Sequence, residues 1–190
     1  MVPTRDHILS TATALVRTSG YAGFSYADLS KVVGIRKASI HHHFATKEDL
    51  TVALVERYEK AFAASLDDLL HAHADAASRL RGYADLYLAG LKDGEACLCG
   101  MLASDFSLVP ERVRSGVERF FAQSIAWLEC VIRQAQVDGM ISSGRDAGEE
   151  AQVFHATILG AMFAARVRPN LAEFVRVSER ALRALLVSGQ

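Results

Sequence analysis

Apolar residues recur at helical spacing along most of the chain. From Thr4 to Gly20, Ile8, Ala12 and Val16 return every four positions, which predicts an amphipathic helix that ends at the glycine. The same spacing predicts later helices over residues 46–70, 76–92, 96–107, 110–138, 147–167 and 170–188. No β-branched, alternating run lies between turn residues, so no sheet is expected. The pattern predicts an all-α protein.

Two helices near the N-terminus are expected to be much shorter than the others. Ser25 and Asp28 form a Ser-x-x-acid cap, and the helix that follows stops at Gly34. The next helix runs from about Arg36 to Phe44. Because a helix of about two turns is unstable alone in water, we expect this pair to pack on longer neighbours as a helix-turn-helix.

The sequence around these short helices resembles the DNA-binding domain of tetracycline-repressor-like (TetR) regulators. Residues 34–48 read Gly-Ile-Arg-Lys-Ala-Ser-Ile-His-His-His-Phe-Ala-Thr-Lys-Glu, and they follow the family pattern in order and spacing. The motif match extends over residues 20–50, and the remainder resembles the family only in length and helical character. The family most often has Tyr where this chain has His41, so family operator sequences do not transfer to it.

The resemblance implies an all-α fold in two parts. An N-terminal three-helix helix-turn-helix DNA-binding domain, residues 1–47, is followed by a larger helical ligand-binding and dimerisation domain, residues 48–190. It also implies a transcription regulator, most simply a repressor, that binds a palindromic operator in double-stranded DNA as a homodimer. Binding of a small organic inducer would release the protein from the operator. Such a protein is not an enzyme and needs no cofactor.

In a helix-turn-helix the second short helix enters the major groove. By helical position, Lys37, Ala38 and His41 are expected to meet base edges. The positions that match the usual sugar-phosphate contacts of the family are Tyr26, Arg36, Ser39, His42, His43 and Lys47. Residues 1–47 hold six Lys and Arg against two Asp, although the whole chain has a net charge of −1. This asymmetry is expected when only the first part touches phosphate.

Other chemistry has little support in the sequence. We find no nucleophile, phosphate-loop or metalloprotease motif. The three consecutive histidines, residues 41–43, are splayed by about 100° each on a helix, so they do not converge on one metal ion. The sequence contains no uninterrupted run of about 18 apolar residues, so no membrane span is expected.

The three cysteines leave one alternative function open. Cys97, Cys99 and Cys130 cannot all pair internally, so a reduced, cytoplasmic protein is expected. Buried thiols are favoured, but a redox-sensing regulator acting through Cys97 and Cys99 remains an alternative. A second alternative is an all-helical protein-interaction module that does not bind DNA.

The inducer, called the effector below, is expected to bind among aromatic and polar side chains on otherwise apolar helices of the larger domain. The candidates are Tyr83, Tyr87, Met101, Phe106, Phe120, Trp127, His155 and Met162. Because few ionisable groups other than Asp105 and His155 lie on these faces, an uncharged or weakly polar organic molecule is favoured over a dianion.

The last two helices are expected to form a two-fold dimer. Residues 154–168 are apolar nearly all round, so this helix must be covered on two sides. Gly160 and Ala164 would let a partner helix approach closely, although the segment could also be the core helix of a monomer. The predicted interface residues are Phe154, Gly160, Phe163, Ala164, Val167, Phe174 and Leu182. A two-fold protein matches the two half-sites of a palindrome.

Overall fold

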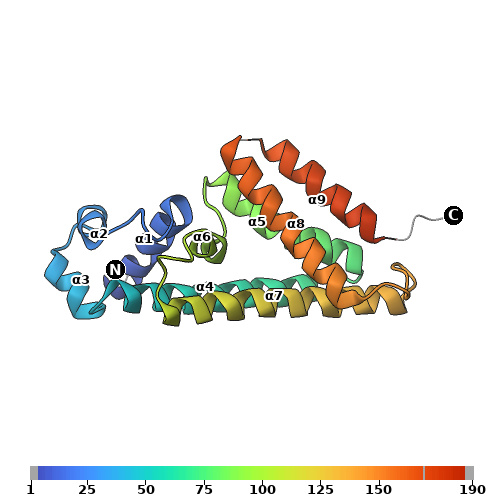
Figure 1. Cartoon of the computed structure of the whole chain (residues 1–190), viewed down its shortest axis with the longest axis horizontal. Coiled ribbons are helices and arrows are strands. Elements are labelled where there is room, and N and C mark those ends of the chain that lie inside the picture. The colour runs from blue at the N-terminus through green and yellow to red at the C-terminus, as the bar shows by residue number, and fades with distance from the viewer. Residues whose placement is uncertain (1–3, 169, 187–190) are drawn as a thin grey trace. The chain divides into compact units, whose positions relative to one another are not determined.

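Nine α-helices and no strand make up the part of the chain that the computed structural model describes, residues 4–168 and 170–186 (Figure 1). In chain order they are α1 (Thr4–Ser19), α2 (Tyr26–Val33), α3 (Lys37–His43), α4 (Lys47–Ala72), α5 (Ala76–Lys92), α6 (Leu98–Ser104), α7 (Glu111–Val137), α8 (Ala147–Val167) and α9 (Leu171–Leu185). The predicted all-α fold is confirmed. None of these helices is long and apolar enough to cross a membrane.

Local capping residues set the ends of the short helices. The Ser25 side chain accepts a hydrogen bond from the Asp28 amide, and the Asp28 carboxylate accepts one from the Ser25 amide, which completes a capping box at α2. Thr46 and Asp49 exchange the same two bonds at the start of α4. Gly34 ends α2 with φ at +75°, a left-handed conformation that favours glycine.

The helices form two compact units. The first unit comprises residues up to 61 together with residues 97–120, and the second comprises residues 62–96 together with those from 121 onward. α4 and α7 therefore each contribute their first part to the first unit and their second part to the second. The sequence did not predict that residues 97–120 join the first unit. The functional boundary after residue 47 remains a prediction.

In the first unit, α1, α2 and α3 share a small core, and α6 lies against α1 (Figure 1). Ile8 and Val16 of α1, Leu29 of α2 and Ile40 of α3 are fully buried. Burying one such side chain stabilises a fold by about 1.5–3 kcal/mol, so this core holds the two short helices that would not be stable alone.

In the second unit, α8 and α9 form an antiparallel hairpin whose helices both contact α5 (Figure 1). α8 and α5 match the predicted ranges 147–167 and 76–92. α6 is shorter than the predicted 96–107. For the last helix, the predicted end at 188 lies outside the described residues.

Candidate functional site

One face of α3 is exposed along its whole length. Ile40 and Phe44 anchor the opposite face, with side chains that are 0% and 4% exposed, and the Arg5 guanidinium lies 5.1 Å from the centre of the Phe44 ring. The exposed positions are Arg36, Lys37, Ala38, Ser39, His41, His42 and His43. All seven were predicted to contact DNA; six of them lie on α3, and Arg36 is its N-cap residue.

Tyr26 and His41 are tied together beside this face. Their ring centres are 4.7 Å apart. The Tyr26 hydroxyl shares its proton with the carbonyl oxygens of Phe44 and Thr46, at 2.9 and 2.6 Å, and burial is the main reason why the pKa of Tyr26 rises to about 12. His41 donates from Nδ1 to the Ala45 carbonyl over 3.0 Å. In the neutral imidazole, Nε2 of His41 is then an acceptor.

Lys47 is embedded in the first unit more deeply than the sequence suggested. Its ammonium donates to the carbonyl oxygens of Tyr21 and Phe24, at 2.6 and 2.7 Å, and lies 4.3 and 4.4 Å from the centres of their rings. Burial lowers the pKa of Lys47, while Asp105 and Asp28 act in the opposite direction. An ammonium has three N–H donors, so two of them hold the turn between α1 and α2 and one remains for another acceptor.

Two lysines share a shallow hollow next to α3. The hollow measures about 340 Å³ and is lined by Phe24, Ser25, Tyr26, Ala27, Lys37, His41 and Lys47. Two ammonium groups beside hydrogen-bonding side chains form a surface that attracts an anion.

Asp105, the residue that ends α6, is bonded to the end of α1. Its Oδ2 accepts hydrogen bonds from the backbone amides of Tyr21 and Ala22, at 2.8 and 3.3 Å. A Cβ added at Gly20, where φ is +76°, would lie only 2.6 Å from this oxygen. Asp105, the C-cap residue directly after α6, thus binds another segment, which accounts for the end of α6 at Ser104 and not at the predicted residue 107.

Aromatic rings gather in the second unit around Tyr83. This aromatic cluster consists of Phe62, Tyr83, Tyr87, Phe121, Trp127, Phe154 and His155. The Trp127 ring stacks on Tyr83 with centres 5.9 Å apart and planes 20° apart, and the Phe121 ring lies 5.4 Å from His155. Tyr83 is completely buried. Four predicted effector-binding residues, on three helices, therefore meet in one place.

A chain of polar contacts runs through the aromatic cluster. The Tyr83 hydroxyl lies 3.1 Å from that of Tyr87 and 2.7 Å from Nδ1 of His155. His155 is only 5% exposed, and this burial lowers its pKa to about 4. The imidazole is therefore neutral at physiological pH.

The other predicted effector residues are not members of the aromatic cluster defined above. Met101 and Phe120 belong to the first unit, where Phe120 packs on Tyr58. Phe106 is 44% exposed beneath the Arg114 guanidinium, and its assignment as an effector-binding residue stays a prediction. Met162 is fully buried in the second unit.

Phe62 is a member of the aromatic cluster that the sequence did not single out. Its ring lies 6.0 Å from Tyr83 and 5.9 Å from Tyr87. In the sequence it is one more apolar position in the stripe of α4, four residues after Tyr58. An aromatic residue at that spacing was the only available signal.

The cysteines give no support to redox sensing. Cys97 and Cys99 are buried, and burial raises the pKa of the Cys97 thiol and raises that of Cys99 well above the ordinary value. Cys130 is exposed. A redox-sensing cysteine needs an accessible thiol with a low pKa, and the two buried cysteines have neither property.

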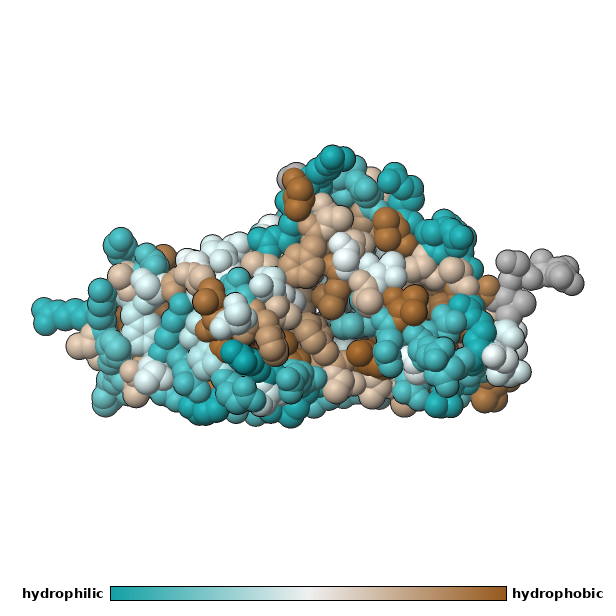
Figure 2. Space-filling view, viewed as in Figure 1, coloured by the Kyte–Doolittle hydropathy of each residue, from teal (hydrophilic) through white to brown (hydrophobic). Residues whose placement is uncertain are grey.

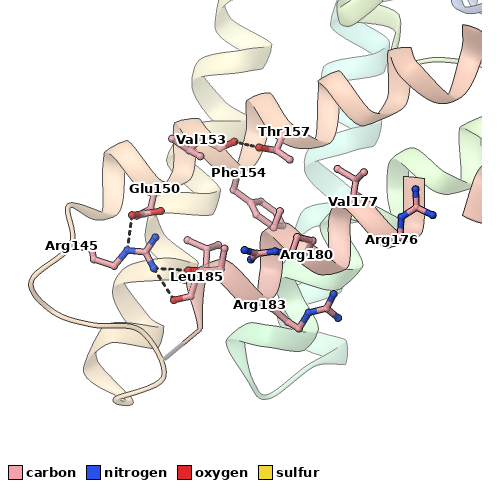
Figure 3. A pocket seen from close by; sticks show the side chains of 12 residues that line it. Arg145, Glu150, Val153, Phe154, Thr157, Arg176, Val177, Arg180, Arg183 and Leu185 are labelled. Carbon is pink, nitrogen blue, oxygen red and sulfur yellow. Dashed lines mark hydrogen bonds and ion pairs between the residues drawn. The ribbon is translucent and has the colours of Figure 1, made fainter. Parts of the chain in front are cut away.

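A groove of about 690 Å³ lies along α8 and α9 (Figure 3). This α8–α9 groove has an apolar floor, including Val153 and Phe154, and α9 supplies Arg176, Arg180 and Arg183 beside it. At one end, Arg145 is held by Glu150 and by the carbonyl oxygens of Ala184 and Leu185. Figure 2 shows apolar residues among the hydrophilic ones over this hairpin.

The predicted interface residues divide into two sets. Phe154, Phe174 and Leu182 are buried within the chain itself, so they pack in its own core and offer little surface to a second chain. Gly160 and Ala164 are exposed, Phe163 is half-buried, and Val167 is 82% exposed. The exposed row is continued by Val153 on α8 and by Leu171 and Val175 on α9.

Comparisons with known proteins extend over almost the whole chain. A family model described as bacterial regulatory proteins, tetR family, matches residues 8–54, and one described as tetracyclin repressor-like, C-terminal domain, matches residues 76–185. The crystal structure of a TetR-family transcriptional regulator from Agrobacterium tumefaciens is 35% identical, covers 97% of this chain and 98% of its own, and has a TM-score of 0.93. That of a TetR transcriptional regulator from Legionella pneumophila is 28% identical with the same coverage and a TM-score of 0.87. The HTH-type transcriptional repressor NemR of Escherichia coli K12 is 27% identical over 170 residues, which are 86% of this chain and 84% of NemR.

Proposed function

Because this chain belongs to the TetR family of bacterial regulatory proteins, we propose that it is a homodimeric repressor of transcription. It binds a palindromic operator in double-stranded DNA, in the bacterial cytoplasm, and releases it when a small uncharged molecule binds the second unit. Family members are DNA-binding regulators and not enzymes, so no residue is given a catalytic role.

The exposed face of α3 is the observation that carries the proposal. Ile40 and Phe44 bury one side of this helix, which leaves Lys37, Ala38 and His41 available to base edges in a major groove. With Nδ1 bonded to Ala45, His41 offers the Nε2 lone pair to an amino group such as N6 of adenine or N4 of cytosine.

Phosphate contacts would fix the position of this helix on the duplex. We assign one phosphate to the hollow between Lys37 and Lys47, and the remaining N–H of Lys47 supports this assignment. Arg36, Ser39, His42 and His43 are exposed and complete the proposed backbone contacts.

The exposed apolar row on α8 and α9 supports a dimer with a second copy of the chain. A Cβ at Gly160 would meet no atom within 4 Å, so the surface there is open to a neighbouring helix. Arg180 and Arg183 flank the α8–α9 groove, and Glu149 lies exposed in the first turn of α8. A surface with both signs of charge around an apolar strip can pair with itself about a two-fold axis.

Release of the operator requires that the effector bind the DNA-incompetent state more tightly, with a coupling of typically about 1–3 kcal/mol. α4 is the proposed lever, because this single helix begins at Lys47 beside the DNA-binding face and carries Phe62 of the aromatic cluster. A shift of α4 would change the spacing of the two α3 helices in the dimer.

Selection of bound sequences from a random DNA library tests the proposal. The expected product is a palindrome with half-sites about 34–36 Å apart. His41→Ala should alter the bases selected within each half-site, whereas His7→Ala, in an exposed part of α1, should leave them unchanged. Enrichment of single, unpaired half-sites, or of no sequence at all, would contradict it.

A further inference from the structure

Two buried ring nitrogens of the second unit, Nε1 of Trp127 and Nε2 of His155, have no hydrogen-bond partner among the described residues. Both rings flank the same side chain, because the centres of Trp127 and His155 lie 5.9 and 6.3 Å from that of Tyr83. Buried polar atoms in native proteins are nearly always hydrogen-bonded. Two such atoms within one aromatic cluster indicate that a bound molecule would supply their hydrogen-bond partners.

We propose that these two nitrogens are the polar contacts of the effector, and that the effector is an uncharged, ring-sized molecule with a carbonyl or equivalent acceptor oxygen. This inference rests on the proposed function, since it assigns the effector site within it. An indole N–H is a donor only, so the Trp127 contact requires an acceptor. Phe62, Phe121 and Phe154 provide ring faces and edges for a flat molecule.

The charge of the ligand follows from the surroundings of His155. Burial alone accounts for the low pKa of His155, and no charged side chain of the described residues contributes to it. A carboxylate placed here would lose its hydration without gaining a cation. Neutral ligands are therefore selected.

The His155 contact adapts to the ligand in a way that the Trp127 contact cannot. If the Tyr83 hydroxyl donates to Nδ1, then Nε2 carries the proton; if Nδ1 donates to Tyr83, then Nε2 is an acceptor. The two arrangements are the two neutral tautomers of His155, which differ in the ring nitrogen that carries the proton, and the Tyr83 and Tyr87 hydroxyls, 3.1 Å apart, can reorient to suit either one. The Trp127 N–H therefore requires an acceptor oxygen on the ligand. His155 can bind a second ligand group that is either a donor or an acceptor.

Trp127 is the only tryptophan of the chain, so its indole N–H gives a single NMR cross-peak that reports on this site. Three probes of similar shape separate the chemistry: acetophenone carries the carbonyl, α-methylstyrene replaces its oxygen with a CH₂ group, and benzoate carries a charge. Acetophenone should shift the indole proton downfield in a saturable manner. α-Methylstyrene should bind about tenfold more weakly and cause no downfield shift, and benzoate should bind more weakly than either.

Variants locate the contacts through the rise in unfolding temperature that acetophenone causes. Trp127→Phe keeps an aromatic ring and removes the donor, and His155→Asn keeps a polar atom near the position of Nδ1 and removes Nε2. Each should raise the dissociation constant about fivefold to tenfold. Gln123→Ala, at an exposed position one turn earlier on α7, should leave it unchanged.

The outcomes also separate this inference from the proposed function. If acetophenone gives no saturable indole shift up to its solubility limit, or α-methylstyrene binds equally well, the effector site is wrong even though operator binding persists. If the indole shift occurs as expected but operator binding in a gel shift is unaffected, the site stands and the proposed release mechanism is wrong.

Discussion

The side chain of Lys47 joins local packing to the proposed DNA contact. Two of its N–H groups bind the carbonyl oxygens of Tyr21 and Phe24, and Lys37, on the same hollow, is exposed at the start of α3. The two lysines carry the same charge, but Lys47 binds the backbone of its own chain, whereas Lys37 is exposed. Their substitution should therefore have different effects on stability and on DNA binding.

Lys37→Met and Lys47→Met form a matched pair. Lys47→Met should lower the free energy of unfolding by about 1–2 kcal/mol, because it removes two charge-assisted hydrogen bonds at a half-buried site. Lys37→Met should leave stability unchanged and reduce the slope of log affinity against log salt by about one unit. Urea unfolding and fluorescence-anisotropy titrations of DNA measure both quantities. Equal stability of the two variants would refute the structural role of Lys47.

The buried imidazole of His155 predicts a pH-dependent stability. Its pKa is about 4 in the folded chain against an ordinary 6.5, so between these values the unfolded state binds the proton and the folded state does not. The contribution of the neutral His155 to the free energy of unfolding is fully present above pH 6.5 and is lost as the pH falls toward 4. From pH 7 to pH 5 the loss should be about 2 kcal/mol. His155→Asn supplies the control: urea denaturation should show a smaller loss for this variant by that amount, and identical losses would contradict the prediction.

At the scale of helices, the sequence correctly predicted the helix ends that depend on residues close to one another in the chain. The ends of α2 and the start of α4 depend on caps formed by neighbours in sequence, such as Ser25 with Asp28, and these were predicted correctly. α6 was predicted too long because Asp105 bonds to a segment more than 80 residues away. No periodicity reports such a contact.

The same limit applies to the candidate sites. An apolar stripe shows that a helix is covered but not by what, so Phe174 and Leu182 were assigned to a partner although they pack within their own chain. The aromatic cluster was predicted in part: Tyr83 and Trp127 were chosen as aromatic side chains of the larger domain, whereas Phe62 was taken as one more apolar position in the stripe of α4. The grouping itself depends on how α4, α5, α7 and α8 pack.

The bond from α6 to the end of α1 predicts a local change in dynamics. Asp105→Ala should accelerate hydrogen exchange of the Tyr21 and Ala22 amides about tenfold or more, because their acceptor is lost. Ser107→Ala, two residues further on at an exposed position, should have no effect. Exchange measured by NMR on both variants decides this, and unchanged protection in Asp105→Ala would show that the contact is absent in solution.

At the scale of the whole molecule, the proposed dimer depends on a surface that has no function in a single chain. Gly160 is exposed in the middle of α8, where a larger side chain would meet nothing within 4 Å of its Cβ. In a monomer, Gly160→Ala should therefore stabilise the helix by about 0.5–1 kcal/mol. In a dimer, a bulky residue at the same position should block the approach of the partner helix.

Gly160→Leu should therefore convert a dimer into a folded monomer of 20.7 kDa. Sedimentation at micromolar concentration measures the mass, and circular dichroism verifies that the helices remain. Ala164→Glu, one turn away, should act in the same way, while Ala64→Leu on an exposed part of α4 should leave the dimer intact. If Gly160→Leu remains dimeric and binds DNA normally, the interface lies elsewhere.

The α8–α9 surface and the α3 surface belong to different units of the chain, which has a genetic consequence. A chain whose α3 cannot bind DNA still carries an intact pairing surface, so it would combine with normal chains in the cell. At equal expression and random pairing, only about a quarter of the dimers would keep two working α3 helices. Alleles altered in α3 should therefore be dominant negative in a merodiploid strain, whereas alleles altered at Gly160 should be recessive.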